Sequence, residues 1–376
     1  MKIAFIGTRG IPARYSGIET SVEEIAIRLA KKGHRVTIYC RKSNEKIDAS
    51  YLPENIKLVN IATVDSKHFG TLAHVFFATL HLMFSDIDIV HFHALGPSLF
   101  AFLPRLVGKK SVVTIHGLDW QRKKWKYFAR LFLSLCEYPA IFFPNKTIVI
   151  SRTLKDYFEN KFKRKVYFIP NGINVWNDSG EKNLSIKKSG YILFVGRLVP
   201  EKGIHYLIKS FNALNTDKKL TIAGESSFTD KYASSLRRQA NKNIEFLGFV
   251  QPEDLPCLYR DAYFLVLPSE IEGSPVSLLE AMSYGKCALV SDIPECLEVI
   301  GDCGVSFRKA DYLDLKEKLR YLIDHPEIVV AVGQKARKRV AENYDWENII
   351  DKLEDVYLSA FNQREFTASE GAGNLS

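Results

Sequence analysis

The amino-acid sequence predicts an α/β protein in which two Rossmann-like domains face each other across a central cleft. Short apolar runs alternate with longer amphipathic segments along most of the 376 residues, and this alternation is typical of parallel sheets covered by helices. The alternation occurs in two series, and the polar segment between them is rich in Lys, Ser and Asn. We interpret that segment as an interdomain linker.

The first series predicts an N-terminal domain over residues 1–173. Strands are expected at 3–7, 35–39, 89–93 and 111–115, and a helix at 18–32 ends at Gly33, a common stop signal. His116 directly follows the last of these strands, at the carboxyl end where α/β proteins bind ligands. It is therefore a candidate site residue.

The second series predicts a C-terminal domain over residues 191–345, after a linker at 174–190. Its strands are expected at 191–195, 220–223, 244–246, 264–267 and 287–290. A further helix is expected at 346–361. Residues 362–376 have no apolar period, which indicates a disordered tail.

The stretch from Glu272 to Glu280 carries the clearest chemical signal. It follows the apolar strand 264–267, and Ser274-Pro275 indicates a helix cap followed by proline at the first helical position. Free N–H groups at such a helix start favour an anion such as a diphosphate. The two carboxylates can accept hydrogen bonds from sugar hydroxyls. This combination indicates a sugar-nucleotide site, with backbone contacts expected from Gly273, Ser274, Val276 and Ser277.

Cations for such a diphosphate occur in Gly196-Arg197 and Lys202-Gly203. Arg197 can grip phosphate oxygens with its planar fork, Lys202 adds a point charge, and the flanking glycines let the backbone approach a ligand closely. Gly17 precedes the first helix, so amides there can bind the same anion from the other domain. With these cations present, a bound metal is not required.

Several motifs together resemble retaining glycosyltransferases of the family-4 type, which have the GT-B fold. The carboxylate stretch is similar to the family's Glu-x7-Glu motif, and the matches extend over roughly residues 1–350. They are Gly7-Thr8-Arg9-Gly10-Ile11-Pro12, Ser16-Gly17-Ile18-Glu19, Val113-Thr114-Ile115-His116-Gly117, Ile169-Pro170-Asn171-Gly172-Ile173, Val195-Gly196-Arg197 to Gly203, Ser291-Asp292-Ile293-Pro294-Glu295 and Gly301-Asp302-Cys303-Gly304. The family usually has two glycines where this chain has Ser16-Gly17.

The resemblance implies transfer of a hexosyl or deoxyhexosyl group from a nucleoside diphosphate sugar, with retention and without a cofactor. It assigns catalytic roles to His116, Glu272, Arg197 and Lys202, and places Glu280 on the ribose. Glu272 could instead be the nucleophile of a covalent intermediate. It also implies that helix 346–361 crosses back to the N-terminal domain. The Gly-Thr-Arg-Gly-Ile-Pro opening resembles bacterial polysaccharide and rhamnosyl-type transferases, which favours a lipid-linked saccharide acceptor.

Two other classes of protein remain open. A nucleotide-sugar 2-epimerase shares the two-domain cleft without transferring a sugar, so the fold alone does not exclude it. A noncatalytic nucleotide-sugar-binding module is also compatible with the motifs. A dinucleotide-dependent oxidoreductase is disfavoured, because the glycines near Gly7 do not follow Gly-x-Gly-x-x-Gly. His91 and His93 end an earlier strand and are either structural or on the acceptor side of the cleft.

Charge is unevenly distributed along the chain. Residues 1–172 contain 27 Lys and Arg against 13 Asp and Glu, a balance of +14, whereas the remainder has 25 against 30. A basic surface can bind nucleic acid, anionic lipid or an acidic acceptor. Given the resemblance, we expect an anionic membrane surface and no nucleic acid. The six cysteines form no Cys-x-x-Cys pair, which favours a reducing cytosol.

Residues 120–133 mix cations with aromatic and apolar residues at helical spacing. This pattern fits a helix in a bilayer interface, and it also fits an amphipathic helix packed on the core. The acceptor-side or membrane-side candidates are Arg122, Lys123, Lys124, Trp125 and Lys126. We see neither a signal peptide nor a membrane-spanning run. The expected location is cytoplasmic, peripherally associated with the inner face of the cell membrane.

Overall fold

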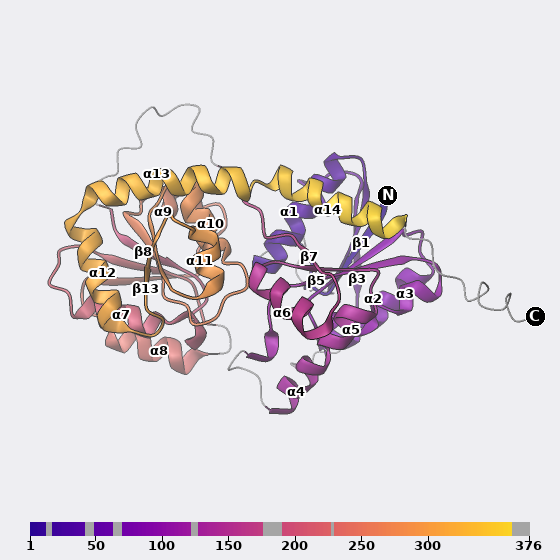
Figure 1. Ribbon diagram of the computed structural model, residues 1–376, viewed down its shortest axis with the longest axis horizontal. Helices are drawn as coiled ribbons and strands as arrows, with labels where there is room; N and C mark the ends of the chain where they lie inside the picture. Colours follow the sequence, from indigo (N-terminus) through magenta and orange to yellow (C-terminus); the bar gives the residue numbers. More distant parts are fainter. Residues whose placement is uncertain are drawn as a thin grey trace, which may run out of the picture.

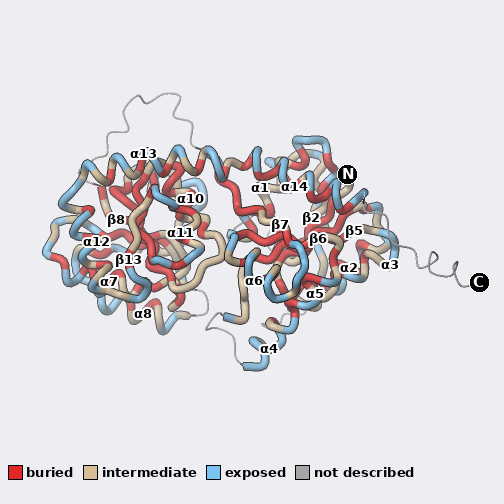
Figure 2. Tube along the Cα trace, viewed as in Figure 1, coloured by how far each residue is buried: buried red, intermediate tan, exposed pale blue. Residues whose placement is uncertain are grey.

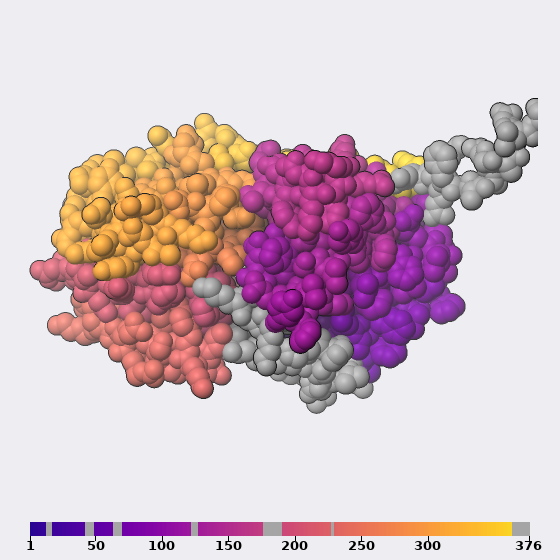
Figure 3. Space-filling model, turned by 60° about the horizontal axis from the view of Figure 1, so that its bottom comes forward, coloured from indigo at the N-terminus to yellow at the C-terminus, as the bar shows by residue number. Residues whose placement is uncertain are grey.

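Two α/β domains lie side by side in the computed structural model (Figure 1). The structure describes residues 1–12, 17–41, 49–62, 70–121, 127–175, 190–226 and 229–362. Most of the predicted linker, the candidates Arg122, Lys123, Lys124, Trp125 and Lys126, and nearly all of the predicted disordered tail lie outside these ranges. On the face that the space-filling view shows, the two domains are in direct contact where grey atoms do not cover them (Figure 3).

The N-terminal domain contains a seven-stranded parallel sheet with the strand order β3-β2-β1-β4-β5-β6-β7. The strands are β1 Lys2–Ile6, β2 Arg35–Arg41, β3 Ile56–Ile61, β4 Ile89–His93, β5 Lys110–Ile115, β6 Lys146–Val149 and β7 Tyr167–Phe168. The apolar side chains of β1, β2, β4, β5 and β6 are buried on both faces, as expected for parallel strands between helices, whereas β3 and β7 have no fully buried side chain. The chain order reverses between β1 and β4, and such a switch point places a ligand crevice at the carboxyl ends of the strands.

Helices cover this sheet. They are α1 Gly17–Lys31, α2 Gly70–Met83, α3 Leu103–Leu106, α4 Tyr127–Leu135, α5 Glu137–Phe142 and α6 Arg152–Phe162, with 3-10 turns at Pro97–Phe100 and Asp119–Gln121. Ser151 caps α6 by accepting a hydrogen bond from the Leu154 amide at 3.2 Å. α4 projects from the N-terminal domain, at the lower edge of the view (Figure 1), and Leu133 is its one buried residue.

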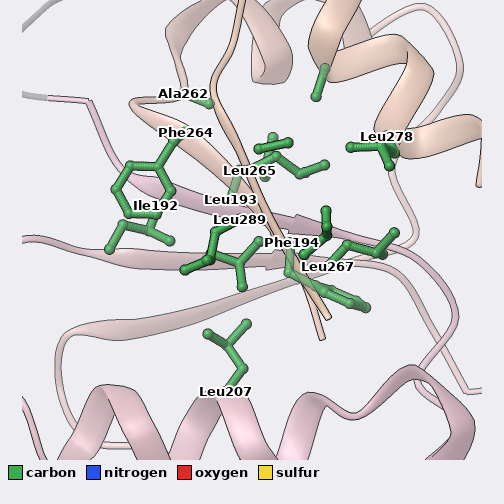
Figure 4. Close-up of a cluster of buried hydrophobic side chains, with 14 of the residues drawn as sticks. Ile192, Leu193, Phe194, Leu207, Ala262, Phe264, Leu265, Leu267, Leu278 and Leu289 are labelled. Carbon is green, nitrogen blue, oxygen red and sulfur yellow. The ribbon is translucent and has the colours of Figure 1, made fainter. Parts of the chain in front are cut away.

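The C-terminal domain has a six-stranded parallel sheet in the order β10-β9-β8-β11-β12-β13. Its strands are β8 Ile192–Val195, β9 Leu220–Ala223, β10 Ile244–Gly248, β11 Phe264–Leu267, β12 Ala288–Ser291 and β13 Val305–Phe307. Its helices are α7 Ile204–Asn212, α8 Asp230–Gln239, α9 Leu255–Asp261, α10 Val276–Ser283, α11 Pro294–Ile300, α12 Tyr312–Asp324 and α13 Pro326–Asn343, and a 3-10 turn spans Pro200–Lys202. Leu207 of α7 packs on one face of the sheet and Leu278 of α10 on the other (Figure 4).

The last helix, α14 (Trp346–Phe361), leaves the C-terminal domain and packs on the N-terminal one (Figure 1). Its buried residues include Trp346, Ile350, Leu353 and Tyr357, which join the core formed by β1, β2 and α1. The side of α14 that faces this core is buried and the opposite side is exposed (Figure 2). The predicted crossover helix and the two Rossmann-like domains are therefore confirmed.

The predicted strands all occur, with ends shifted by at most two residues. β3, β6, β7 and β13 were not predicted. β3 carries side chains of mixed burial and β7 has two residues, so neither gives the continuous apolar run of a buried strand. No helix in the described part of the chain is long and apolar enough to cross a bilayer.

Candidate functional site

A pocket lies between the two domains at the carboxyl ends of their strands. From the N-terminal domain it is lined by Gly117, Leu118, Gln121, Thr153, Leu154 and Tyr157, and from the C-terminal domain by Arg197, Glu201, Lys202, Ile271, Glu272, Gly273 and Glu295. The C-terminal residues follow β8 and β11 or open α11. Four residues that the sequence singled out therefore lie together here: Arg197, Lys202, Glu272 and Gly273.

Lys202 and Glu272 form an ion pair in this pocket, with 2.5 Å between Nζ and Oε1. Ser269 Oγ also donates to Glu272 Oε1, at 2.6 Å. The two charged side chains are only 16% and 9% exposed, so each depends on its partner for the solvation that water no longer provides. The residue predicted to bind phosphate, Lys202, is therefore in direct contact with a residue predicted to bind sugar hydroxyls, Glu272.

Glycine backbone holds Lys202 in place. Gly203 has φ +66°, and a Cβ there would lie 1.9 Å from the Pro268 carbonyl oxygen. No side chain fits that position, because both the conformation and the space require glycine. The 3-10 turn that carries Lys202 can therefore pack directly on the end of β11, beside the loop that carries Glu272.

Gly273 brings the domains into close contact. A Cβ at Gly273 would lie 2.2 Å from the carbonyl oxygen of His116, which belongs to the other domain. Asn171 adds a second link, since it accepts from Ser21 Oγ at 3.0 Å and donates to the Ser274 carbonyl at 3.3 Å. These contacts fix the position of His116 relative to the carboxylate loop.

Two helix N-termini meet near this contact. Gly17 is the first residue of α1 and Val276 the first of α10, and a Cβ at Gly17 would lie 3.2 Å from Val276 Cγ2. Helix N-termini carry partial positive charge, so their approach favours a bound anion between the domains. The predicted cap is wrong in detail: Pro275 is the N-cap of α10, and Ser274 precedes it. Ser274 Oγ is buried without a hydrogen bond in the described part of the chain.

Glu280 lies on the second turn of α10 and is not among the residues that line the interdomain pocket. It accepts a hydrogen bond from Tyr259 Oη, with 2.6 Å between the oxygens. Burial raises the pKa of Glu280 to about 7, and the Tyr259 hydrogen bond opposes this only partly. Glu280 is therefore a carboxyl group whose charge changes near neutral pH.

His116 directly precedes Gly117 of the pocket and is 7% exposed. Its Nε2 lies 2.9 Å from Nδ1 of His93. His91 and His93, whose role the sequence left open, are both buried in the sheet. His91 bonds through Nδ1 to Tyr357 Oη and through Nε2 to Thr114 Oγ1, each at 2.7 Å.

The structure adds pocket residues to which the sequence analysis gave no role. Glu201 and Glu295 belong to sequence motifs that the sequence analysis named, so their membership in the site could have been predicted from those motifs. Burial raises the pKa of Glu295, and the nearby Glu272 charge adds to the effect. Gln121, on the 3-10 turn Asp119–Gln121, and Tyr157, on α6, belong to no motif that points to the cleft, so only the folded structure reveals them as pocket residues.

Of the helix that the spacing suggested over residues 120–133, the described part of the chain shows α-helix only from Tyr127 on, and residues 122–126 lie outside that part. Asp119–Gln121 is a 3-10 turn and α4 begins at Tyr127. Trp120 packs inward, because its Nε1 donates to the buried Glu137 Oε1 at 2.6 Å. Most large apolar residues of α4, by contrast, face solvent: Tyr127 is 74% and Phe128 82% exposed, while Leu133 is buried.

Comparison with known proteins agrees with this arrangement. The family model "Glycosyltransferase Family 4" matches residues 15–176, and the model "Glycosyl transferases group 1" matches residues 177–339. The boundary between the two models falls at the start of the predicted linker.

Curated relatives align over nearly the whole chain. An uncharacterized glycosyltransferase of Methanocaldococcus jannaschii is 29% identical, in an alignment that covers 96% of this chain and 98% of the relative. The Escherichia coli UDP-Gal:alpha-D-GlcNAc-diphosphoundecaprenol alpha-1,3-galactosyltransferase is 24% identical, covering 91% and 94%. Among solved structures, sucrose-phosphate synthase of Thermosynechococcus elongatus superposes with a TM-score of 0.82 at 19% identity, covering 96% and 99%.

Proposed function

The chain is a glycosyltransferase of the GT-B fold, and we propose that it transfers a hexosyl or deoxyhexosyl group from a nucleoside diphosphate sugar to a saccharide acceptor. The observation that supports this most directly is the interdomain pocket in which Arg197, Lys202 and Glu272 meet. The cations suit a diphosphate and the carboxylate suits sugar hydroxyls, so one pocket holds groups for both halves of the donor.

The leaving group of the proposed reaction is a nucleoside diphosphate, on which negative charge grows as the glycosidic bond breaks. Arg197 and Lys202 would bind its oxygens, and amides at the starts of α1 and α10 would add partial positive charge from both domains. The glycine backbone at Gly17 and Gly196 leaves room for the diphosphate. We propose a metal-independent reaction, since these groups supply the charge stabilisation that a divalent cation would provide.

The donor's hydroxyl groups would be held by two carboxylates. Glu272 lines the pocket and would accept from hydroxyls of the transferred sugar, while Lys202 turns toward the phosphate. In the absence of a donor, the Glu272 carboxylate would thus pair with Lys202 in place of the phosphate, and the Lys202 ammonium would pair with Glu272 in place of the sugar hydroxyls. Glu280 would accept from the ribose hydroxyls, and backbone groups of Gly273, Ser274, Val276 and Ser277 would line the path between the sugar and the ribose.

We propose retention of configuration without a covalent intermediate. Glu272 Oε1 already accepts two hydrogen bonds, from Lys202 and Ser269, and a carboxylate stabilised in this way is a poor nucleophile. The acceptor would then attack from the face of the leaving group, and a phosphate oxygen would take its proton. His116 would orient a donor hydroxyl and help to stabilise the cationic sugar ring.

We propose that the acceptor is a lipid-linked saccharide of surface polysaccharide biosynthesis. The relative named for a diphosphoundecaprenol-linked acceptor aligns over 91% of this chain. An acceptor anchored in a bilayer would require the enzyme to work at the membrane surface, and the N-terminal domain has features suited to that.

The proposed membrane contact is α4, acting on an anionic bilayer from the cytoplasmic side. Tyr127, Phe128 and Leu135 are 74%, 82% and 57% exposed. Of the 22 exposed large apolar side chains among the described residues, 15 lie between Tyr51 and Phe142, so the exposure is concentrated in the N-terminal domain. That domain is also the basic half of the chain, which matches the charge of anionic lipid.

A donor panel followed by a transfer assay tests the function. UDP-, GDP- and dTDP-sugars are screened by thermal unfolding, where a donor at 100 times its Kd adds about 2.7 kcal/mol of stability. The stabilising donor is then incubated alone and with lipid-linked saccharides. We expect product only with an acceptor. Conversion of the nucleotide sugar alone would indicate an epimerase, and binding without any conversion would indicate a binding module.

A further inference from the structure

We propose that Glu137 is a positioning residue that holds the N-terminal wall of the interdomain pocket in place for the acceptor. The N-terminal wall consists of the pocket residues that the N-terminal domain contributes: Gly117, Leu118, Gln121, Thr153, Leu154 and Tyr157. This role rests on the proposed function, because the pocket is taken to bind a donor and an acceptor together. The contacts of Glu137 themselves do not depend on that function.

Glu137 is a buried carboxylate at the start of α5, and 0% of its side chain is exposed. Trp120 Nε1 donates to its Oε1 at 2.6 Å, and Lys161 Nζ donates to its Oε2 at 2.6 Å. The Tyr157 hydroxyl lies 3.2 Å from Oε1 and 3.1 Å from Oε2. Burial raises the pKa of Tyr157, so its hydroxyl keeps the proton with which it donates. Both oxygens of Glu137 therefore accept hydrogen bonds, and its charge is paired.

Two of these donors come from the segments that form the N-terminal wall. Trp120 belongs to the 3-10 turn Asp119–Gln121, whose last residue lines the pocket. Tyr157 belongs to α6 and lines the pocket itself. A 3-10 turn has poor internal hydrogen-bond geometry, so the bond from Trp120 to Glu137 helps to fix it. Through this one carboxylate the turn and α6 are held in a defined position relative to each other.

Stability alone does not account for a carboxylate at this position. A buried ion pair is often no more stabilising than well-packed apolar residues of similar volume. An apolar side chain, however, could not accept hydrogen bonds from Trp120 and Tyr157, which lie on different elements. Glu137 accepts from both. We therefore assign to Glu137 the alignment of the N-terminal wall rather than the stability of the domain.

The two walls of the pocket differ in charge, and this difference indicates what the N-terminal wall binds. The C-terminal domain contributes five charged residues, which are Arg197, Glu201, Lys202, Glu272 and Glu295. The N-terminal wall, as far as the structure describes it, has no charged residue, and its polar side chains are Gln121, Thr153 and Tyr157. Amide and hydroxyl groups suit the hydroxyls of an uncharged sugar. The ligand expected at this wall is therefore a neutral sugar residue of the acceptor.

Two double variants of the full-length protein isolate the positioning role. Glu137→Leu with Lys161→Met, called the Leu variant, replaces the ion pair by apolar side chains of similar volume, which should preserve stability to denaturant. It removes the acceptor for Trp120 and Tyr157. Glu137→Gln with Lys161→Met, called the Gln variant, lacks the same ion pair but keeps an amide oxygen to which both can donate. The two variants therefore differ in the hydrogen bonds that hold the wall.

The first measurement needs no substrate and follows the indole N–H of Trp120 in ¹H–¹⁵N spectra. The signal is assigned by its absence from Trp120→Phe. We expect slow exchange with solvent in the wild type and in the Gln variant, and exchange about tenfold faster in the Leu variant, because a hydrogen bond to a charged group is lost. Unchanged exchange in the Leu variant would overturn the proposal. A failed transfer assay would not affect this result.

The second measurement uses the lipid-linked saccharide that gives product in the transfer assay. In the Leu variant, kcat/KM for this acceptor should fall by about 10- to 100-fold, since a displacement of about 1 Å can cost about 100-fold in rate. The Gln variant should restore most of it. Calorimetric affinity for UDP, GDP and dTDP should be unchanged in both variants, because Arg197 and Lys202 lie on the opposite wall.

Three results would overturn the role of Glu137. One is an acceptor kcat/KM that is the same in the Leu and Gln variants. Another is a loss of nucleoside diphosphate affinity in the Leu variant as large as the loss in acceptor kcat/KM. The third is a Leu variant that does not fold, since the ion pair would then be needed for stability.

Discussion

Gly273→Ala should inactivate the enzyme without unfolding it. The added Cβ would lie 2.2 Å from the His116 carbonyl oxygen and 3.2 Å from Ile150 Cδ1, whereas ordinary contacts begin at 3.4 Å. The carboxylate loop and the end of β5 must therefore separate by about 1.2 Å. These segments belong to different domains, so the separation can occur at the boundary between them while each core stays intact.

A displacement of about 1 Å at a reacting centre can cost about 100-fold in rate. Turnover at saturating donor and acceptor should therefore fall by about that factor, while the unfolding temperature changes little. The matched control is Gly96→Ala, since Gly96 has φ −58° and its nearest neighbour would lie 3.9 Å away. Wild-type turnover in Gly273→Ala would refute the view that this contact sets the geometry of the site.

Three other substitutions follow from the same structure. Arg197→Ala should weaken binding of the nucleoside diphosphate by about 1.5 to 3 kcal/mol, or about 10- to 150-fold, because a charge-assisted hydrogen bond is lost; unchanged calorimetric affinity would remove Arg197 from the site. Burial raises the pKa of Glu280 from 4.5 to about 7, so its contribution to stability is full below about pH 4.5 and is lost as pH rises through 7. Glu280→Gln cannot ionise and should therefore gain about 2 to 3 kcal/mol over the wild type at pH 8 but far less at pH 5, by denaturant unfolding. Phe128→Ser with Leu131→Ser should reduce sedimentation with anionic vesicles, and this reduction should depend little on salt. Replacing Arg122, Lys123, Lys124 and Lys126 by Ser should reduce sedimentation in the same way as high salt does. If both folded variants sediment as strongly as the control Leu313→Ser, which changes an exposed residue of the other domain, this docking surface is excluded.

The sheets were the most predictable part of the fold. Buried parallel strands such as β4 and β11 form continuous apolar runs, and their ends could be placed to within two residues. The start of α10 was less predictable, because Ser-Pro suits either of two cap positions and packing decides between them.

The site residues could be predicted where they belong to short sequence motifs. Arg197, Lys202, Glu272 and Gly273 were identified in this way and meet in one pocket. The contacts of His93 and Trp120 could not be predicted. His93 reaches His116 because β4 pairs with β5 in a register that aligns His93 with Thr114, and Trp120 turns inward because Glu137 accepts its N–H. Both depend on tertiary packing.

Calorimetric titration of UDP, GDP and dTDP into the wild type and Lys202→Met tests the proposed donor site most directly. We predict that at least one diphosphate binds the wild type and binds Lys202→Met at least tenfold more weakly. The control Lys209→Met, which removes an exposed cation stacked over Tyr312 in the same domain, should bind like the wild type. Equal affinity in wild type and Lys202→Met, or no binding of any diphosphate, would contradict a donor site at this pocket.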